Sequence, residues 1–358
     1  MARTTATILI PDISGFTEFM TNTELSHSSF AISTLINTII ETVGDEYEIS
    51  EIEGDAVLMF KRGPAPSQKE IQDICLKIFN AFHFQRSWMQ QHVICPCKAC
   101  VEMDRLTLKF MAHHGPIGEI KAGKFTKLSG MDVIVAHRLL KNSVPSNEYL
   151  LLSEQLLHQS TETPGTDRME WAPSSDDYSS IGKVEYRFAL LNEQRKKAPE
   201  APKPEVHYPA DATVDFEIPI AINYQEAYMI LMNVPNRPEW LKGLKSVEQQ
   251  IPAAFVGSVH HCAFDNYKTV VSPLQMIAGD DQITYAESCV VEALDLSLVY
   301  EIIFRKLTAN DCLFSGRIIN AGTSPIKDEI RAELLSCLQS MGESLKEYCE
   351  NLEMHELH

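Results

Sequence analysis

Apolar and polar positions follow two different periodicities, strand-like and helical, along the first 190 residues. Short apolar runs typical of buried strands occur at ATILIPD, which stops at Pro11 and Asp12, and at residues 106–113. Residues 46–60 alternate in two strand-like runs around Glu53, Gly54 and Asp55, which predicts a hairpin. Helical periodicity predicts helices over residues 24–42, 67–90 and 130–141, and further strands are expected at 148–152 and 182–191.

The second half of the chain mixes strands and helices in another order. A strand is expected at residues 215–219, a helix at 224–232, then several strand-like stretches and a long amphipathic helix at 326–352. This order predicts a curved antiparallel sheet wrapped around a C-terminal helix. The first half therefore indicates an α/β or α+β sandwich, and an α+β fold is predicted for the chain as a whole.

A polar segment separates the two halves. Residues 192–214, NEQRKKAPEAPKPEVHYPADATV, hold four prolines and several charges without apolar periodicity, which predicts an extended linker. A chain of 358 residues exceeds one ordinary core, so we expect two domains, residues 1–191 and 215–358.

Composition narrows the choice of partners and compartment. The formal net charge of −18 argues against a nucleic-acid partner, because phosphate backbones attract basic surfaces. No run approaches the roughly 20 apolar residues of a membrane span, and the N-terminus lacks signal-peptide features, so a cytoplasmic protein is expected. Nine cysteines without an export signal are expected to be reduced.

Asp12 and Asp55 are candidate metal ligands. One ends a buried strand and the other occupies a hairpin turn, and each has a glycine nearby, Gly15 and Gly54. Paired carboxylates suit hard divalent cations, which take oxygen ligands. The alternative is that Asp12 caps a helix and Asp55 is an ordinary turn residue.

The sequence segments around these aspartates resemble those of a known family. PDISGFT at residues 11–17, EGDAV at 53–57, HHGPIG at 113–118 and GMDVIVAHRL at 130–139 resemble the metal-binding segments, a strand with a Gly-Pro turn and the catalytic helix of class III adenylyl and guanylyl cyclases. The resemblance covers about residues 5–191. It implies a ferredoxin-like class III nucleotidyl cyclase domain acting as a head-to-tail homodimer.

The resemblance also implies roles for individual residues. Asp12 and Asp55 would hold two magnesium or manganese ions on a nucleoside triphosphate, and Arg138 would stabilise the transition state. Lys183 would contact the triphosphate. The segment expected to lie near the phosphates consists of Ile13, Ser14, Gly15, Phe16 and Thr17.

Two positions depart from the family pattern. Ile134 occupies the position of a ribose-binding asparagine and cannot hydrogen-bond. Glu51, at a base-selecting position, matches guanylyl cyclases, but its partner position holds Lys127, and the two side chains can pair and close the base pocket. These residues favour GTP or an unusual nucleotide over ATP for a metal-dependent cyclase. They also leave open a catalytically silent homologue that binds nucleotide or only dimerises.

A cluster of cysteines offers a second metal site. The possible zinc ligands are His92, Cys95, Cys97 and Cys100, all within nine residues. His113 or His114 is an alternative fourth ligand. A cluster of buried thiols or a redox-sensitive loop explains the same residues without metal.

Residues 213–352 resemble START-like helix-grip proteins, the polyketide cyclase and aromatase relatives, through IPI at 218–220, YQEAY at 224–228 and NRPEW at 236–240. The resemblance implies a cavity between sheet and helix for a hydrophobic small molecule, so this half is expected to act as a ligand sensor. It also leaves open that this half is the main actor, as a lipid or polyketide binder. The candidate lining residues are Trp240, Phe255, Phe264, Tyr285 and Met341. His260, His261 and Asp265 lack the surroundings of a catalytic site.

Overall fold

The computed structural model describes residues 4–21, 25–95, 100, 102–123, 125–160, 169–203, 214–249, 255–291, 296–321 and 325–356. The chain divides into two compact units, each with its own sheet, which confirms the expected α+β class. The first unit contains Met1–Gln90 and Val101–Ala201, and the second contains Gln91–Cys100 and Pro202–His358. Within the described ranges, no helix has the length and apolarity needed to cross a membrane.

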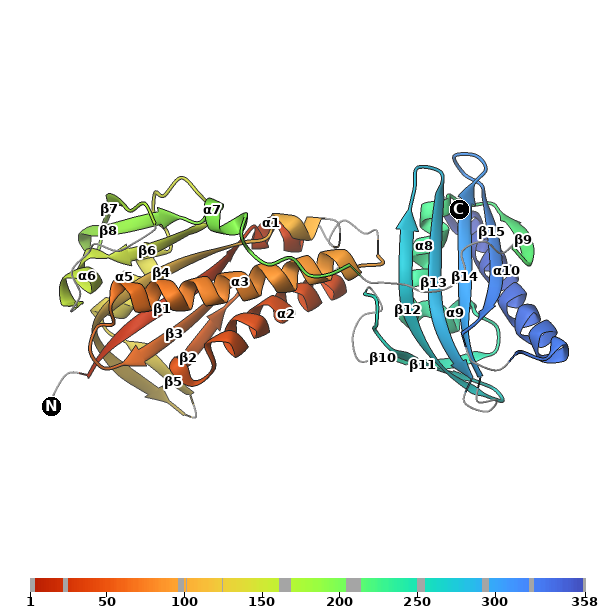
Figure 1. Ribbon diagram of the computed structural model, residues 1–358, viewed down its shortest axis with the longest axis horizontal. Coiled ribbons are helices and arrows are strands. Elements are labelled where there is room, and N and C mark those ends of the chain that lie inside the picture. The colour runs from red at the N-terminus through yellow and green to blue at the C-terminus, as the bar shows by residue number, and fades with distance from the viewer. Residues whose placement is uncertain are drawn as a thin grey trace. The chain divides into compact units, whose positions relative to one another are not determined.

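The first unit is built on a mixed sheet with the order β2-β3-β1-β4-β6-β8-β7, to which β5 adds by pairing with β4 (Figure 1). All neighbours along this path for which a register is recorded are antiparallel, except that β4 and β6 are parallel. The strands are β1 Thr4–Ser14, β2 Glu48–Glu53, β3 Ala56–Arg62, β4 Thr107–Ala122, β5 Phe125–Ser129, β6 Tyr149–Ser153, β7 Ala172–Tyr178 and β8 Gly182–Leu190.

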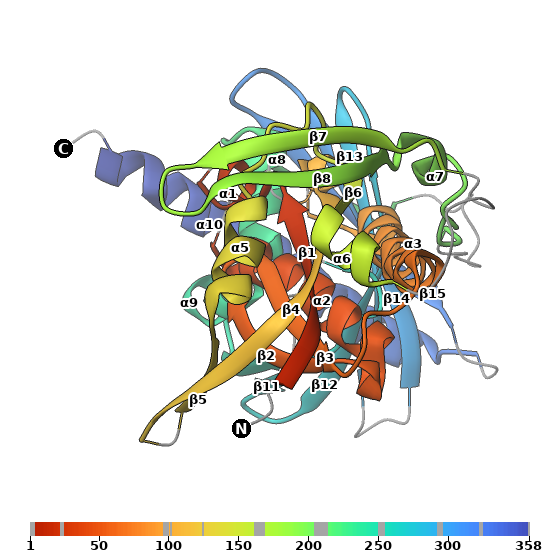
Figure 2. The same ribbon diagram turned by 90° about the vertical axis from the view of Figure 1, so that its left-hand side faces the viewer.

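Helices cover both faces of this sheet. Ile8 and Ile10 of β1 pack with Val133 and Ala136 of α5, whereas Leu9 points to the other face. Figure 2 shows α5 and α6 in front of the sheet and α2 and α3 behind it. The helices are α1 Phe16–Thr21, α2 Leu25–Val43, α3 Gln68–His92, α5 Met131–Leu139, α6 Glu154–Gln159 and α7 Asn192–Arg195, with short 3-10 turns η1 Gly44–Glu46 and η2 Glu102–Arg105.

Two prolines do not interrupt their strands as the sequence predicts. β1 continues through Pro11 to Ser14. Its recorded pairs with β3 are interrupted between Leu9 and Asp12, so Pro11 lies at a gap on that side, while its pairing with β4 is unbroken. The expected turn at Gly115 and Pro116 is likewise wrong. β4 runs through both residues to Ala122, pairing first with β1 and then with β5.

The second unit is an antiparallel sheet with the order β10-β11-β12-β13-β14-β15-β9. Its apolar face packs against α8 and the long α10, which contributes Leu334, Leu338, Leu345 and Cys349 to the core (Figure 1). The strands are β9 Phe216–Ile220, β10 Leu244–Gln249, β11 His260–Phe264, β12 Lys268–Ala278, β13 Gln282–Val291, β14 Leu296–Lys306 and β15 Cys312–Asn320. The helices are α8 Tyr224–Met232, η3 Val234–Asn236, α9 Arg237–Trp240 and α10 Asp328–Glu356.

The unit boundaries differ from a single cut in the expected linker. Residues 91–100, expected in the first domain, count with the second unit, where Ile94 is fully buried in the core and Val93 bridges to Phe255. Tyr228 donates its hydroxyl hydrogen to the Ile94 carbonyl. The expected linker begins with a helix, α7, and its residues up to Ala201 count with the first unit.

Candidate functional site

The two aspartates meet at the ends of neighbouring strands of the first unit. Asp12 pairs in register with Ala56, the first residue of β3, and Asp55 precedes it in the turn that Gly54 allows with a φ of +64°. The Asp55 carbonyl accepts a hydrogen bond of 3.0 Å from Ile13 N–H. Sheet register and a tight turn therefore hold both carboxylates at the rim of the sheet.

The two carboxylates interact electrostatically. Burial raises the pKa of Asp55, and the neighbouring charge of Asp12 raises it further. Lys109, which pairs with Asp12 on β4, opposes this, and its Nζ lies 3.3 Å from Asp12 Oδ2. Together these three groups carry one net negative charge.

Ser14 supplies a further oxygen on the same face of β1 as Asp12. Its side chain is 8% exposed, and its Oγ has no hydrogen-bond partner among the residues that the structure describes. A buried hydroxyl without a partner costs free energy unless a ligand or water satisfies it. The two interacting carboxylates are oxygen ligands of the kind that a hard divalent cation takes, and the Ser14 hydroxyl lies two residues beyond Asp12 on the same strand.

Residues 13–17, which were expected near the phosphates, belong partly to the end of β1 and partly to the start of α1. Ile13 uses its N–H in the bond to Asp55, so that group is not available to a phosphate. Gly15 forms the turn after β1 with a φ of +89°, and its carbonyl accepts from Phe19 N–H. Phe16 and Thr17 begin α1, a helix of six residues.

A buried chain of hydrogen bonds orients α5. His113 Nε2 lies 3.0 Å from Asp132 Oδ1 at the start of α5, and His113 Nδ1 lies 2.7 Å from Ser153 Oγ at the end of β6. Gln155 donates to the same Asp132 oxygen at 2.8 Å. Gly115 makes room for this carboxylate, since a Cβ there would lie 2.3 Å from it.

Two of the candidate residues lie on the exposed side of α5. Arg138 is exposed, and Ile134 presents an apolar side chain that is 47% exposed. A hydrocarbon side chain offers no hydrogen bond, so the expectation that Ile134 cannot bind a ribose stays a prediction.

Ion pairs form at the positions that the resemblance assigned to base selection. Lys127 Nζ lies 2.7 Å from Glu51 Oε2 and 3.7 Å from Glu53 Oε1, so the pairing of Glu51 with Lys127 that the sequence allows does form. His137 Nδ1 of α5 lies 3.4 Å from Glu53 Oε2. The ligand atoms of Glu51, Glu53 and His137 lie within 4.8 Å of one another, but Lys127 already supplies a cation there.

The remaining candidate residues lie elsewhere. Lys183 is on β8, where its Nζ pairs with Glu185 at 2.7 Å. Cys95 and Cys100 are buried, and their sulfurs lie within 4.8 Å of each other. Cys97 is outside the described residues, so the four-ligand zinc set stays a prediction. In the part of the chain that the structure describes, His92 joins no group of three close metal-ligating atoms.

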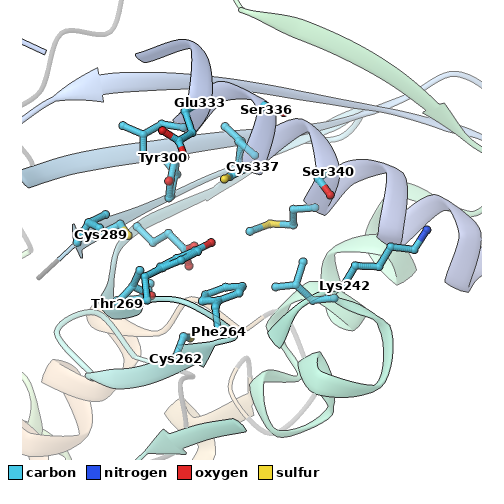
Figure 3. Close-up of a pocket in the computed structure, with 18 of the residues that line it drawn as sticks. Lys242, Cys262, Phe264, Thr269, Cys289, Tyr300, Glu333, Ser336, Cys337 and Ser340 are labelled. Atoms are coloured by element: carbon cyan, nitrogen blue, oxygen red, sulfur yellow. The ribbon is translucent and has the colours of Figure 1, made fainter. Parts of the chain in front are cut away.

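The second unit contains a cavity of about 550 Å³ between its sheet and α10 (Figure 3). Phe264 and Met341 line it as expected, but Phe255 and Tyr285 are buried without lining it, and Trp240 lines a separate hollow. Sequence reasoning missed Lys109, which lies inside a predicted strand, and the buried pair Arg237 and Glu287 in this cavity. The Arg237 position lay within the quoted NRPEW segment, whereas Glu287 carried no local signal.

Comparison with known proteins places the chain near uncharacterised sequences. A family described as a protein of unknown function (DUF2652) matches residues 32–149. The uncharacterized protein Rv2561/Rv2562 of Mycobacterium tuberculosis is 31% identical over 147 residues, which cover 40% of this chain and 66% of that protein. The chain thus spans slightly less than two thirds of this relative.

Solved structures that resemble parts of the chain include two cyclases. The catalytic core of a rhodopsin-guanylyl cyclase with converted specificity, in complex with ATPalphaS, has a TM-score of 0.40 at 15% identity, covering 52% of this chain and 96% of that one. The guanylyl cyclase Cya2 has a TM-score of 0.37 at 15% identity, covering 59% and 97%. A START superfamily protein from Mycobacterium smegmatis has a TM-score of 0.31 at 11% identity, covering 38% and 96%. At these values, function has to be argued from the residues of this chain itself.

Proposed function

We propose that the first unit binds a nucleoside triphosphate together with magnesium or manganese at Asp12 and Asp55. The observation that supports this most directly is the electrostatic interaction of two carboxylates at the sheet rim, Asp12 on β1 and Asp55 in the turn before β3, with the unpartnered Ser14 hydroxyl two residues beyond Asp12 on β1. Their repulsion, only partly offset by Lys109, is relieved by a divalent cation.

The charges suit a metal that arrives with an anion. The net charge of minus one at Asp12, Asp55 and Lys109 balances only half of the charge of one divalent ion. The rest has to come from an anion, and a triphosphate carries enough negative charge to bring a second ion with it. The metal would polarise and neutralise phosphate oxygens. Asp12 and Asp55 would hold it, and Lys109 would remain as a fixed cation beside the phosphates.

Turnover to a cyclic nucleotide and pyrophosphate is the second candidate function. Arg138 supports it, because an exposed guanidinium on α5 can reach a phosphate on a partner molecule in a homodimer. Ile134 and the Glu51–Lys127 pair oppose it, since they withhold a ribose contact and occupy the base-selecting positions. If a nucleotide is cyclised, GTP or an unusual nucleotide is preferred over ATP.

The second unit is proposed to bind an apolar small molecule in its cavity and to act as the sensor of the protein. The support is a cavity of about 550 Å³, within the usual size range of ligand sites, with largely apolar walls. A scaffold that dimerises through the first unit while the second binds its ligand is the alternative if nucleotide is bound without turnover.

The test is a titration of the purified chain with manganese, followed by electron paramagnetic resonance, alone and with each of the four nucleoside triphosphates. Wild-type protein should bind manganese more tightly with a triphosphate present, and Asp12→Asn and Asp55→Asn should each weaken binding at least tenfold. Asp73→Asn, an exposed carboxylate paired with Lys69 on α3, is the matched control and should bind as wild type. Equal losses in all three variants, or no binding by wild type, would reject the site.

The same samples are assayed for cyclic product and pyrophosphate. Product that disappears in Arg138→Ala supports the cyclase, whereas tight binding without product from any triphosphate supports the silent homologue.

A further inference from the structure

The cavity of the second unit has apolar walls and a charged interior. Phe264, Val271, Val291, Leu338 and Met341 are among its apolar lining residues. In Figure 3, Phe264 and Thr269 lie across the cavity from Cys337 and Ser340 of α10. The exposed Lys242 and Glu333 also line it, and Lys242 pairs with Glu347 at 2.6 Å.

Two fully charged side chains lie inside. Arg237 of α9 and Glu287 of β13 both line the cavity, and each is only 2% exposed. Arg237 Nη2 lies 3.5 Å from Glu287 Oε2, which also accepts a 2.7 Å hydrogen bond from the Tyr285 hydroxyl. Placing a charge pair inside an apolar cavity is costly, and packing alone does not explain it.

The three guanidinium nitrogens of Arg237 differ in their hydrogen bonds. Arg237 Nε donates to the Leu231 carbonyl at 3.0 Å, and Nη1 lies 3.4 Å from His260 Nε2. Nη2 makes no hydrogen bond to any residue that the structure describes, because 3.5 Å to Glu287 is beyond ordinary hydrogen-bond geometry. A buried guanidinium hydrogen gains from an acceptor that a ligand brings in.

The surrounding charges decide which acceptor fits. Burial lowers the pKa of His260 to about 3, so this ring is neutral at pH 7. Burial raises the pKa of Cys262 to about 11 and that of Cys289 to about 12, so both thiols are neutral as well. Arg237 and Glu287 thus balance each other inside the cavity, while the lining Lys242 and Glu333 are exposed and Lys242 is paired with Glu347. An anionic ligand beside Arg237 would add a second buried negative charge next to Glu287.

We propose that the cavity selects a neutral ligand with an apolar body and a carbonyl or ether-like oxygen, which accepts a hydrogen bond from Arg237 beside Glu287. A hydroxyl also fits, since it can accept from Arg237 and donate to Glu287. Carboxylates and pure hydrocarbons are disfavoured. This inference rests on the proposed ligand-binding function of the second unit and adds the chemical class of its ligand.

The experiment compares three ligands of nearly equal shape: 2-acetylnaphthalene, 2-isopropylnaphthalene and 2-naphthoate. Each is used to displace the apolar fluorescent probe N-phenyl-1-naphthylamine from the full chain. A hydrogen bond to a charged donor corresponds to a preference of about 10- to 100-fold. We expect the ketone to bind more tightly than the hydrocarbon by at least the lower value, and more tightly than the carboxylate.

Two double variants test whether Arg237 and Glu287 cause the preference for the ketone. Arg237→Met with Glu287→Gln removes both charges together, so no buried charge is left alone, and it should abolish the ketone preference while the hydrocarbon still binds. Arg317→Met with Glu301→Gln is the matched control, because that pair is also buried, with a 2.7 Å contact, but does not line the cavity. It should keep the wild-type preference. Circular dichroism checks that both variants fold.

The outcomes separate the two proposals. If neither the probe nor any naphthalene binds wild type, the ligand-binding function fails, and the inference fails with it. If the ligands bind but the ketone has no advantage, or if the carboxylate binds most tightly, only the inference about ligand class is overturned. Loss of the preference in the Arg317 and Glu301 control also overturns it, since the effect would then be structural.

Discussion

The Lys109 ammonium group lies 3.3 Å from the carboxylate of Asp12, on the strand that pairs with β1 on the side opposite β3. Asp12 thus has a cation on one neighbouring strand and a second carboxylate, Asp55, at the end of the other. If Asp12 binds a metal as proposed, Lys109 competes with a bare ion for the same carboxylate.

Replacing Lys109 with methionine should strengthen manganese binding in the absence of nucleotide. Removing one positive charge a few ångströms from the ion corresponds to about a 3- to 10-fold gain at the effective dielectric of a protein surface. With a triphosphate present the gain should shrink or reverse, because the phosphates lose the cation that Lys109 supplies in the wild type. Manganese titration measures both, and Lys69→Met on α3 is the control. Weaker binding of the bare ion by the Lys109 variant would contradict the competition.

Asp55→Asn should raise the melting temperature at pH 7 without metal. Because burial and Asp12 raise the pKa of Asp55 in the folded protein, folding favours its protonated form, and stability is lost as pH rises through that pKa. The variant lacks this loss, so its advantage of roughly 1–3 °C should vanish below the ordinary aspartate range. Manganese should stabilise wild type and leave the variant unchanged.

Asp176→Asn gives the opposite sign and serves as the control. Although burial acts against it, hydrogen bonds from Tyr186 and Ser143 lower the pKa of Asp176, so its ionised form is favoured by folding. Its variant should be less stable than wild type at pH 7. Thermal melts across pH check both variants, and the same sign for the two would refute the assignment.

Gly115→Ala should destabilise the first unit by about 1–3 kcal/mol, the usual cost of overpacking. The new Cβ would lie 2.3 Å from the Asp132 carboxylate, which would have to leave His113 and shift the start of α5. Gly279→Ala, where the nearest atom is 3.5 Å away, should be nearly neutral. Urea unfolding followed by circular dichroism gives both values, and equal effects would show that the close approach is unimportant.

Ile94→Ala should destabilise the second unit, although Ile94 follows closely on α3 of the first. Ile94 is fully buried in the core with Tyr228 and Trp240, so its truncation should cost about 2–5 kcal/mol. Urea unfolding reports this through Trp240 once Trp88 and Trp171 are replaced by phenylalanine. Ile277→Ala, 54% exposed on β12, is the control and should change stability by less than about 0.5 kcal/mol.

The zinc prediction is tested by metal analysis of protein purified without a histidine tag. About one zinc per chain is expected, lost in Cys97→Ser, because a structural zinc needs four nitrogen or sulfur ligands. Cys312→Ser, a buried thiol of β15, is the control and should keep the metal. A metal-free wild type would leave Cys95 and Cys100 as buried thiols.

The sequence by itself determined most of the elements and the place of the paired aspartates. Apolar periodicity located α8 at Tyr224–Met232 without error, and α2, α3, α5 and α10 within a few residues, since periodicity is a local property. The hairpin around Gly54 followed from turn chemistry in the same way. The local signals misled at Pro11 and Pro116, where the pairing of neighbouring strands decides whether a proline is tolerated.

Only the tertiary structure decided what surrounds the sites. Lys109 reaches Asp12 through strand register, across almost a hundred residues of sequence, and Arg237 meets Glu287 because α9 lies over β13. Packing also decides that Ile94 belongs to the core of the second unit, because the sequence of a short apolar stretch does not indicate which core it joins. The pairing of Asp12 and Asp55 was therefore readable from the sequence, whereas the lysine beside Asp12 and the charged interior of the cavity depend on long-range pairing and packing.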